Sequence, residues 1–169
     1  LSTLLTQITY DAVNAGQLDE YAQVLSRNTL EGLGHKLGTD GKDVFYGNNL
    51  SNYLMGADGN DTLHGRGGDD ILSGGTGDDE LYGGAGKDTL IGGAGNDKLE
   101  GGNGEADTYI FAAGHGQDIV NDYGSNQAHT DTLRFEGAVL ADAVFTRSDN
   151  DLVIKAFGAE DAVAVSNYF

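Results

Sequence analysis

A nine-residue repeat runs through the middle of this 169-residue chain and constrains its fold more than any other feature. Eight consecutive copies start at Gly38, each with glycine first: GTDGKDVFY, GNNLSNYLM, GADGNDTLH, GRGGDDILS, GGTGDDELY, GGAGKDTLI, GGAGNDKLE and GGNGEADTYIF. In the first seven copies the eighth position is large and apolar, and the sixth is aspartate or asparagine. Self-similarity at a fixed short period predicts stacked, identical units rather than one globule with a mixed core.

Each unit divides into a turn and a short strand. The first six positions are rich in glycine, which takes positive φ at no steric cost and allows close backbone approach. The last three alternate polar, apolar, polar, so one apolar side chain points inward. Two units then close a flattened coil, and coils stacked about 4.8 Å apart form two parallel sheets around a column of leucines. We therefore expect an all-β parallel solenoid.

The sixth-position aspartates of every second repeat should stack along one edge of these coils. A row of carboxylates about 5 Å apart would repel strongly, so a cation is expected between them. The available ligands are carboxylate and glycine carbonyl oxygens, which favour Ca²⁺ over Zn²⁺ or a soft metal and place Mg²⁺ second. The expected neighbours are Asp43 with Asp61, Asp61 with Asp79, Asp79 with Asp97, Asp70 with Asp88, Asp88 with Asp107, and Asp97 with Asp118 of the degenerate repeat AGHGQDIVN.

The repeats resemble those of the RTX (repeats-in-toxin) family, whose haemolysin-type nonapeptide is GGxGxDxUx, with U a large apolar residue. The best copies are GGTGDDELY, GGAGKDTLI and GGAGNDKLE, and the resemblance covers about residues 38–123. It implies a calcium-bound parallel β-roll in a secreted bacterial protein. It also implies export in the unfolded state through the type I secretion machinery, with the protein acting outside the cell.

The same resemblance implies a ligand set. Each sixth-position aspartate gives a side-chain oxygen, one turn gives the carbonyls of its first and third positions, and the next turn but one gives those of its second and fourth. We expect about five or six calcium ions. The candidate ligands are Asp43, Gly56, Asp58, Asp61, Gly65, Gly67, Asp70, Gly74, Gly75, Thr76, Gly77, Asp79, Gly83, Gly84, Ala85, Gly86, Asp88, Gly92, Gly93, Ala94, Gly95, Asp97, Gly101, Gly102, Asn103, Gly104, Asp107, Gly114, Gly116 and Asp118.

Several residues depart from the repeat pattern. Asn52 replaces the aspartate of its copy, so no site is expected between Asn52 and Asp70. The carboxylates of Asp69, Asp78 and Glu80 are out of phase and are expected on the solvated surface. In an alternative interpretation the glycines and aspartates only form turns, as they commonly do singly. That interpretation does not explain why seven apolar residues and six aspartates share one phase.

The two flanks carry different patterns. Residues 1–33 show apolar spacing typical of a helix, which predicts that residues 1–37 form a short α-helical flank that either caps the first coil or is the stub of a neighbouring domain. Residues 38–123 form the predicted roll. Residues 124–169 contain strand patterns separated by the turn segments SDND and GAED, which predicts a β-rich C-terminal cap. This segment also resembles the one that often follows RTX repeats. Asp122 and Asp131 could either complete a terminal ion site or lie in a solvated loop.

Composition excludes several classes of function. The chain has 27 acidic and 9 basic residues, a net charge of −18 that disfavours nucleic acid and anionic membrane surfaces. It lacks cysteine, which excludes disulfides and thiolate metal sites, and it has no apolar run long enough for a membrane span. The chain begins at Leu1 without a basic leader, so we expect a fragment of a longer protein.

No catalytic motif is recognisable. HExxH and GxSxG are absent, and His35, His64, His115 and His129 are far apart, so we expect a protein that is not an enzyme. The sequence predicts a calcium-binding RTX module, part of a larger secreted toxin, adhesin or exoenzyme, that folds when it binds Ca²⁺. The alternatives are the non-catalytic C-terminal domain of a secreted protease, lipase or epimerase, and a ligand-binding adhesin module.

Overall fold

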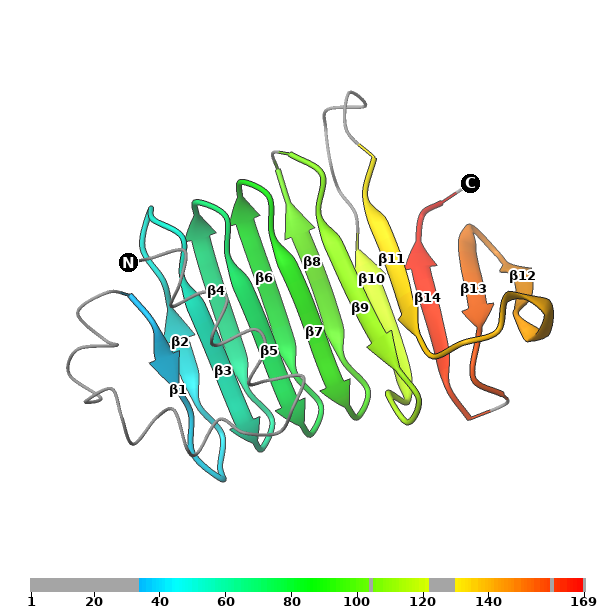
Figure 1. Ribbon diagram of the computed structural model, residues 1–169, viewed down its shortest axis with the longest axis horizontal. Helices are drawn as coiled ribbons and strands as arrows, with labels where there is room; N and C mark the ends of the chain where they lie inside the picture. The colour runs from blue at the N-terminus through cyan, green and yellow to red at the C-terminus, as the bar shows by residue number, and fades with distance from the viewer. Residues whose placement is uncertain (1–33, 104, 122–129, 159, 169) are drawn as a thin grey trace.

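The computed structural model describes residues 34–103, 105–121, 130–158 and 160–168 (Figure 1). The helix expected in residues 1–37 falls almost wholly outside this part of the chain. The elements are β1 Lys36–Leu37, β2 Val44–Tyr46, β3 Tyr53–Asp58, β4 Thr62–Gly67, β5 Ile71–Thr76, β6 Glu80–Ala85, β7 Thr89–Ala94, β8 Lys98–Gly102, β9 Thr108–Ala112, β10 Gln117–Asn121, β11 Thr132–Glu136, the 3-10 helix η1 Leu140–Asp142, β12 Val144–Ser148, β13 Asp151–Lys155 and β14 Ala162–Ser166.

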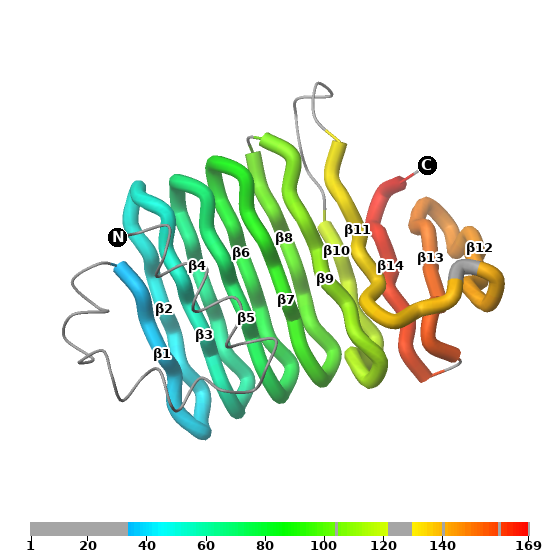
Figure 2. The backbone as a smooth tube through the Cα atoms, viewed as in Figure 1, coloured from blue at the N-terminus to red at the C-terminus, as the bar shows by residue number. Residues whose placement is uncertain are grey.

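The strands form two sheets that face each other across the leucine column. Sheet A has the order β1-β3-β5-β7-β9-β11, and sheet B has the order β12-β13-β14-β10-β8-β6-β4-β2. Successive strands of the repeat region therefore alternate between the sheets, as the coiled path in Figure 2 shows. Residues pair in parallel with those one coil away, for example Leu63 with Leu81 and Leu81 with Leu99. The predicted parallel β-roll is confirmed.

The strands are longer than the sequence pattern predicts. The strand β5 includes Gly74, Gly75 and Thr76, the first three positions of the expected turn, and β4, β6 and β7 extend in the same way. Only the fourth to sixth positions remain as the turn. Glycine is required here because Gly75 has a φ of 117°, and a Cβ built on it would lie 1.9 Å from the carbonyl oxygen of Ala57 in the preceding coil.

The core is one side chain thick in the regular coils. Its inner column consists of Leu54, Leu72 and Leu90 from sheet A and Leu63, Leu81 and Leu99 from sheet B, all completely buried. Towards the C-terminal end larger residues and β-branched residues take over, namely Tyr109, Phe111, Val120, Val163 and Val165. Each coil thus buries two apolar side chains and depends on its neighbours for the rest of its packing.

The roll extends beyond the regular repeats at both ends. Lys36 and Leu37, which the sequence pattern placed in the flank, already pair with β3. At the other end β11 pairs in parallel with β9 and β14 with β10, while β12 and β13 add two antiparallel strands to sheet B. The four strands expected in the C-terminal segment are present. None of the described elements is a helix long and apolar enough to cross a bilayer.

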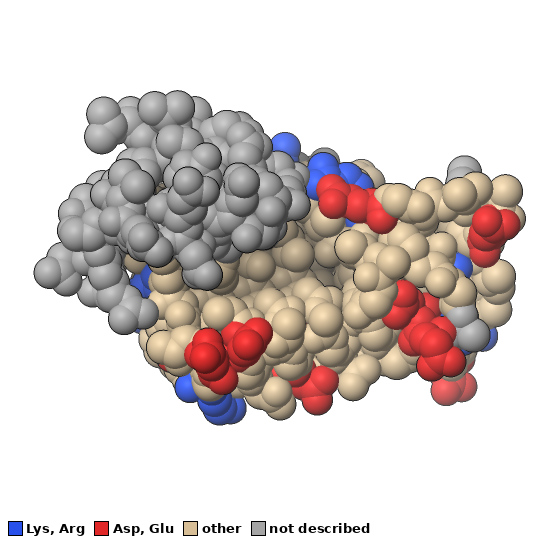
Figure 3. All heavy atoms as spheres, turned by 60° about the horizontal axis from the view of Figure 1, so that its bottom comes forward, with Lys and Arg blue, Asp and Glu red and all other residues tan. Residues whose placement is uncertain are grey.

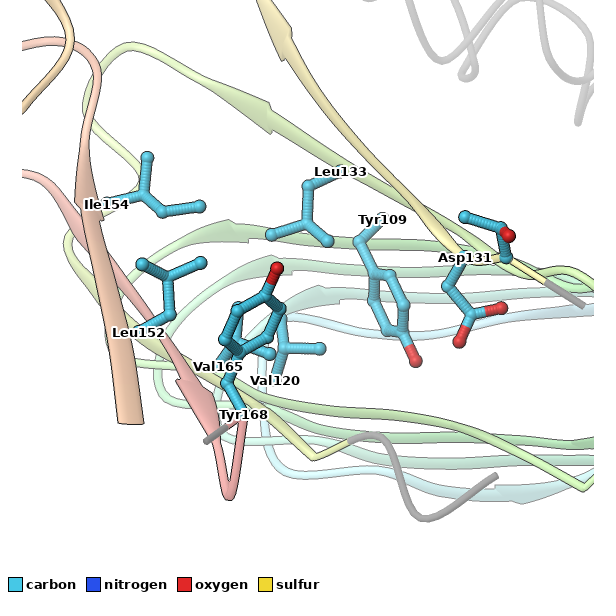
Figure 4. Close-up of a pocket in the computed structure, with 9 residues that line it drawn as sticks. Tyr109, Val120, Asp131, Leu133, Leu152, Ile154, Val165 and Tyr168 are labelled. Carbon is cyan, nitrogen blue, oxygen red and sulfur yellow. The ribbon is translucent and has the colours of Figure 1, made fainter. Parts of the chain in front are cut away.

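The interior widens into a cavity of about 390 Å³ where the regular coils end. It is lined by Tyr109 and Leu133 from sheet A and by Val120, Leu152, Ile154 and Val165 from sheet B (Figure 4). Its lining includes a single acidic residue, Asp131. The cavity is therefore a loosely filled part of the core rather than an oxygen-rich site.

The outer face of sheet B carries a stack of rings. Tyr46 and His64 have ring centroids 4.9 Å apart, and His64 and Tyr82 have centroids 4.7 Å apart, in nearly parallel planes. His64 therefore points outward, as its ninth position predicts, but it is half-buried between two tyrosines. The stack links three successive coils.

Candidate metal centre

Sixth-position residues line the two edges of the roll in two rows. Row B is Asp43, Asp61, Asp79, Asp97 and Asp118, and row A is Asn52, Asp70, Asp88, Asp107 and Asp131. The seven from Asp61 to Asp118 that are in phase with the repeats are at most 3% exposed. Asp69, Asp78 and Glu80, which are out of phase, are exposed instead, and Figure 3 shows acidic side chains in several separate groups on the face that it presents.

One oxygen of each aspartate in the rows, apart from Asp43 at the start of row B, joins two coils. The backbone N–H of each sixth-position residue donates to Oδ1 of the next member of its row. These bonds measure 2.7 to 3.0 Å from Asp43 to Asp118 in row B and 2.6 to 2.8 Å from Asn52 to Asp131 in row A. The structure therefore brings together every aspartate pair expected from the repeat phase. It also brings Asp131 into row A.

The second oxygen is different. Oδ2 of five aspartates is buried and has no hydrogen-bond donor in the described part of the chain; these are Asp61, Asp70, Asp79, Asp88 and Asp97. Buried polar groups are normally paired, and a carboxylate oxygen can only accept. Each of these oxygens therefore lacks a positive partner.

Backbone carbonyls converge on the same places. A Cβ built on Gly74 would lie 2.1 Å from Oδ2 of Asp79 and 2.5 Å from the carbonyl oxygen of Gly92. The equivalent position on Gly56 lies 2.1 Å from Oδ2 of Asp61 and 2.6 Å from the carbonyl oxygen of Gly74. Gly65 and Gly83 show the same arrangement with Asp70 and Asp88. Each of these first-position glycines thus leaves a small space beside an aspartate Oδ2 and a backbone carbonyl oxygen, and we call this space the cradle.

The ends of the rows do have donors. Oδ2 of Asp43 accepts from the backbone N–H of Thr39 at 2.7 Å and from its hydroxyl at 3.0 Å. Oδ2 of Asp118 lies 2.7 Å from Nδ1 of His115. In row A, Asn52 accepts from the N–H of Asn48 and donates its own amide back to the Asn48 side chain, consistent with no site there. Neither Thr39 nor Asn48 is among the residues that the repeat pattern predicts for the sites.

The other candidate ligands lie in and beside the turns. The carbonyls of Thr76 and Ala94, at third positions, already accept from the N–H groups of Gly59 and Gly77. Gly114 and Gly116 donate their N–H groups to Asp161. The remaining backbone candidates line the strand ends next to the rows, namely Gly67, Ala85, Gly86, Gly93, Gly95, Gly102 and Asn103, whereas Gly104 is outside the described residues.

Out-of-phase acidic side chains are exposed but are not merely solvated. Oδ1 of Asp78 accepts from the N–H of Asn96 at 2.8 Å, and Oδ1 of Asp69 accepts from the N–H of Lys87 at 3.0 Å. Asp58 accepts from the hydroxyl of Thr76. Asp69 and Asp78 therefore lie on the exposed surface, as expected, and together with Asp58 they also join neighbouring turns.

The electrostatics of the rows are unfavourable without a cation. Burial raises the pKa of Asp70 and Asp97 to about 7, and that of Asp79 and Asp88 to about 6. Repulsion from nearby carboxylates also raises these pKa values, whereas the hydrogen bonds from backbone N–H groups lower them. Burial also raises the pKa of Asp61. No group of three or more His, Cys, Asp or Glu side chains converges within the described ranges, so most ligands of an ion here would be carbonyl oxygens. This donor set fits a hard cation.

The match with a family model agrees with this chemistry. The family described as RTX calcium-binding nonapeptide repeat (4 copies) matches residues 37–72, 46–81 and 73–105. A 63-residue region is 45% identical to iron-regulated protein FrpA from Neisseria meningitidis serogroup C, and the match spans 37% of this chain but only 6% of that protein. The crystal structure of the extracellular lipase LipA from Serratia marcescens aligns with a TM-score of 0.36 and 20% identity, covering 79% of this chain and 37% of the lipase. The repeat segment of this chain, residues 37–105, consists of RTX calcium-binding nonapeptide repeats and belongs to that family.

Proposed function

We propose that the two rows bind Ca²⁺ at the five aspartates whose Oδ2 lacks a donor, and that this binding folds the roll. The observation that supports the proposal is that each orphaned oxygen lies beside a first-position glycine, and that a backbone carbonyl oxygen joins it there at Asp61, Asp70, Asp79 and Asp88. The expected number of ions is therefore about five. RTX repeats bind calcium in general, and the orphaned oxygens support the choice of these five aspartates.

The two oxygens of each of these carboxylates have different partners. Oδ1 accepts a hydrogen bond from the N–H of the neighbouring coil and fixes the side chain. Oδ2 and the nearby glycine carbonyl are left to face a cation. The first-position glycine excludes any Cβ from this space. When bound, calcium supplies the positive charge that the buried carboxylates otherwise lack.

Folding depends on calcium because the rest of the chain supplies little stability. Each coil buries only two leucines, whereas ordering the backbone costs roughly 1–2 kcal/mol per residue. The net charge of −18 opposes compaction further. An ion that binds the folded roll and not the unfolded chain adds its binding energy to folding. Affinities of about 10⁻⁴–10⁻³ M, typical of extracellular modules, would keep the chain unfolded until it meets extracellular calcium.

We further propose that the chain is a non-catalytic part of a larger secreted bacterial protein and that the type I secretion machinery exports it. RTX repeat proteins are typically secreted, and the match with FrpA spans 6% of that relative, consistent with a module of a long protein. Whether the larger protein is a toxin, an adhesin or an exoenzyme depends on residues outside this chain.

A calcium titration followed by far-UV circular dichroism tests the folding proposal. Strand signal should be low in ion-depleted neutral buffer, should rise cooperatively with Ca²⁺, and should rise much less with Mg²⁺. Full strand signal without divalent ions would refute it.

Calcium counting by equilibrium dialysis tests the choice of residues. Asp79→Asn keeps an Oδ1 acceptor but loses the charged Oδ2, so it should bind at least one ion fewer than the wild type. Its neighbour Asp78 is exposed and out of phase, so Asp78→Asn is the matched control and should bind the full number. Equal counts in the two variants would contradict the phase assignment.

A further inference from the structure

The last coil of row B differs from the coils before it. Oδ1 of Asp118 accepts the N–H of Asp97 at 3.0 Å, as in the rest of the row, but Oδ2 lies 2.7 Å from Nδ1 of His115. Both side chains are buried. Because an ionised carboxylate only accepts hydrogen bonds, we assign the shared hydrogen to Nδ1 of the imidazole.

His115 is held in place from several directions. Its ring packs against Phe111 of β9 with centroids 5.2 Å apart and meets Phe157 edge-on at 5.9 Å. Its carbonyl accepts the N–H of Gly95. The glycines on either side of it, Gly114 and Gly116, donate to the carboxylate of Asp161 just before β14. The imidazole is therefore a fixed part of the end of the roll.

The position that His115 takes at Asp118 is the one that is left without a donor at Asp61, Asp79 and Asp97. We infer that His115 closes row B in place of a calcium ion, so that Asp118 gives no oxygen to calcium. The inference rests on the proposed function of the rows. It replaces the ligand role that the family resemblance implied for Asp118.

The start of row B supports the same interpretation. There the backbone N–H and hydroxyl of Thr39 donate to Oδ2 of Asp43. Both ends of the row thus have donors from the protein itself, and the three aspartates without donors are the three between them. The closed ends fix the number of cation positions in this row.

Calcium counting on the full chain distinguishes the two kinds of aspartate. Asp97→Asn and Asp118→Asn are matched, since both residues belong to row B, are about 2% exposed and accept or donate in the same ladder. Asp97→Asn should bind at least one ion fewer than the wild type, whereas Asp118→Asn should bind the same number. Loss of an ion in both variants would overturn the role of His115 while leaving the proposed function intact. A wild type that binds no calcium, or an Asp97→Asn protein that binds the full number, would overturn the proposed function and this inference with it.

Nitrogen NMR of the calcium-loaded wild type provides a test that needs no variant. With ¹⁵N-labelled histidine, the His115 ring should show a hydrogen on Nδ1, protected from exchange by its bond to Asp118. His64, which is half-buried on the outer face of sheet B, serves as the internal comparison. A His115 ring with its hydrogen on Nε2 alone would overturn the inference even if Asp118→Asn failed to fold.

Discussion

At the scale of single residues, the two oxygens of each buried aspartate have separate roles. Oδ1 is needed for the ladder between coils, and Oδ2 is needed for charge. Asn52 shows the same phase without the charge, because its Oδ1 accepts the N–H of Asn48 in its own turn and its amide nitrogen donates to the Asn48 side chain. We therefore expect an Asp→Asn change in this phase to remove a cation site with little change in shape.

The glycine beside each aspartate should matter as much as the carboxylate. In Gly74→Ala the new Cβ would lie 2.1 Å from Oδ2 of Asp79 and 2.5 Å from the carbonyl oxygen of Gly92, neither of which can move without breaking the coil. We expect the calcium concentration at the midpoint of folding to rise by about tenfold, which corresponds to roughly 1.4 kcal/mol. Circular dichroism during a calcium titration measures this midpoint.

The control is Gly41→Ala. A Cβ on Gly41 meets no atom within 4 Å, and neither glycine has the positive φ that would add backbone strain. Its midpoint should match that of the wild type. Similar midpoints for the two alanine variants would mean that the space beside Asp79 is not used.

At the scale of strands, the leucine column is the part of the fold where the loss of one side chain is expected to cost most stability. Leu81 is completely buried and pairs with Leu63 and Leu99 in the coils on either side. Leu81→Ala should lower the free energy of unfolding by about 2–5 kcal/mol, because a cavity forms in a core that is one side chain thick. Urea unfolding in saturating calcium measures the loss.

Val44→Ala is the comparison for this substitution. Val44 is 48% exposed on β2, so its truncation should change the unfolding free energy by no more than about 0.5 kcal/mol. A comparable loss in both variants would show that the column is not what limits stability in the presence of calcium.

The sequence predicted the phases of the strands well but their extents poorly. Leu63, Leu81 and Asp79 lie where the repeat places them, because a strict period fixes register in stacked coils. The extra strand residues were missed because glycine is ordinarily depleted in strands. In this fold Gly75 pairs with Gly93, and the close approach of their backbones is what requires the glycine.

The closing groups of the rows could not be predicted from the period. His115 is three residues from Asp118, but its loop is fixed by Asp161, which lies 45 and 47 residues from the glycines that it binds. Asp131 joins row A across a separation of 24 residues rather than 18. Such contacts depend on how the C-terminal strands return to the roll, which a local pattern does not contain.

At the scale of the whole molecule, the buried carboxylates predict an unusual response to pH. In the folded state the pKa of Asp70 and Asp97 is about 7 and that of Asp79 and Asp88 about 6, against an ordinary value of 3.8. Without calcium the folded roll retains protons that the unfolded chain releases between pH 3.8 and about 7. Its stability therefore falls as pH rises through that window and is constant above it.

Circular dichroism in buffer depleted of divalent ions should thus show more strand signal at pH 5 than at pH 8. In limiting calcium the trend should reverse, because calcium requires the ionised carboxylates that acid removes. A calcium-free protein that loses strand signal on acidification from pH 8 to pH 5 would contradict the burial of these groups.

The alternation of strands between sheets A and B has a consequence for how such a chain can change in length. Gain or loss of a single nonapeptide would move every later strand into the opposite sheet and every later aspartate to the opposite edge. The C-terminal strands would then join the wrong sheet. A whole coil can be duplicated or deleted without that penalty, and odd residues can be absorbed in a bend, as between Asp88 and Asp107, which lie 19 apart. Recombination within the repeats should therefore add or remove nonapeptides in pairs, one whole coil at a time.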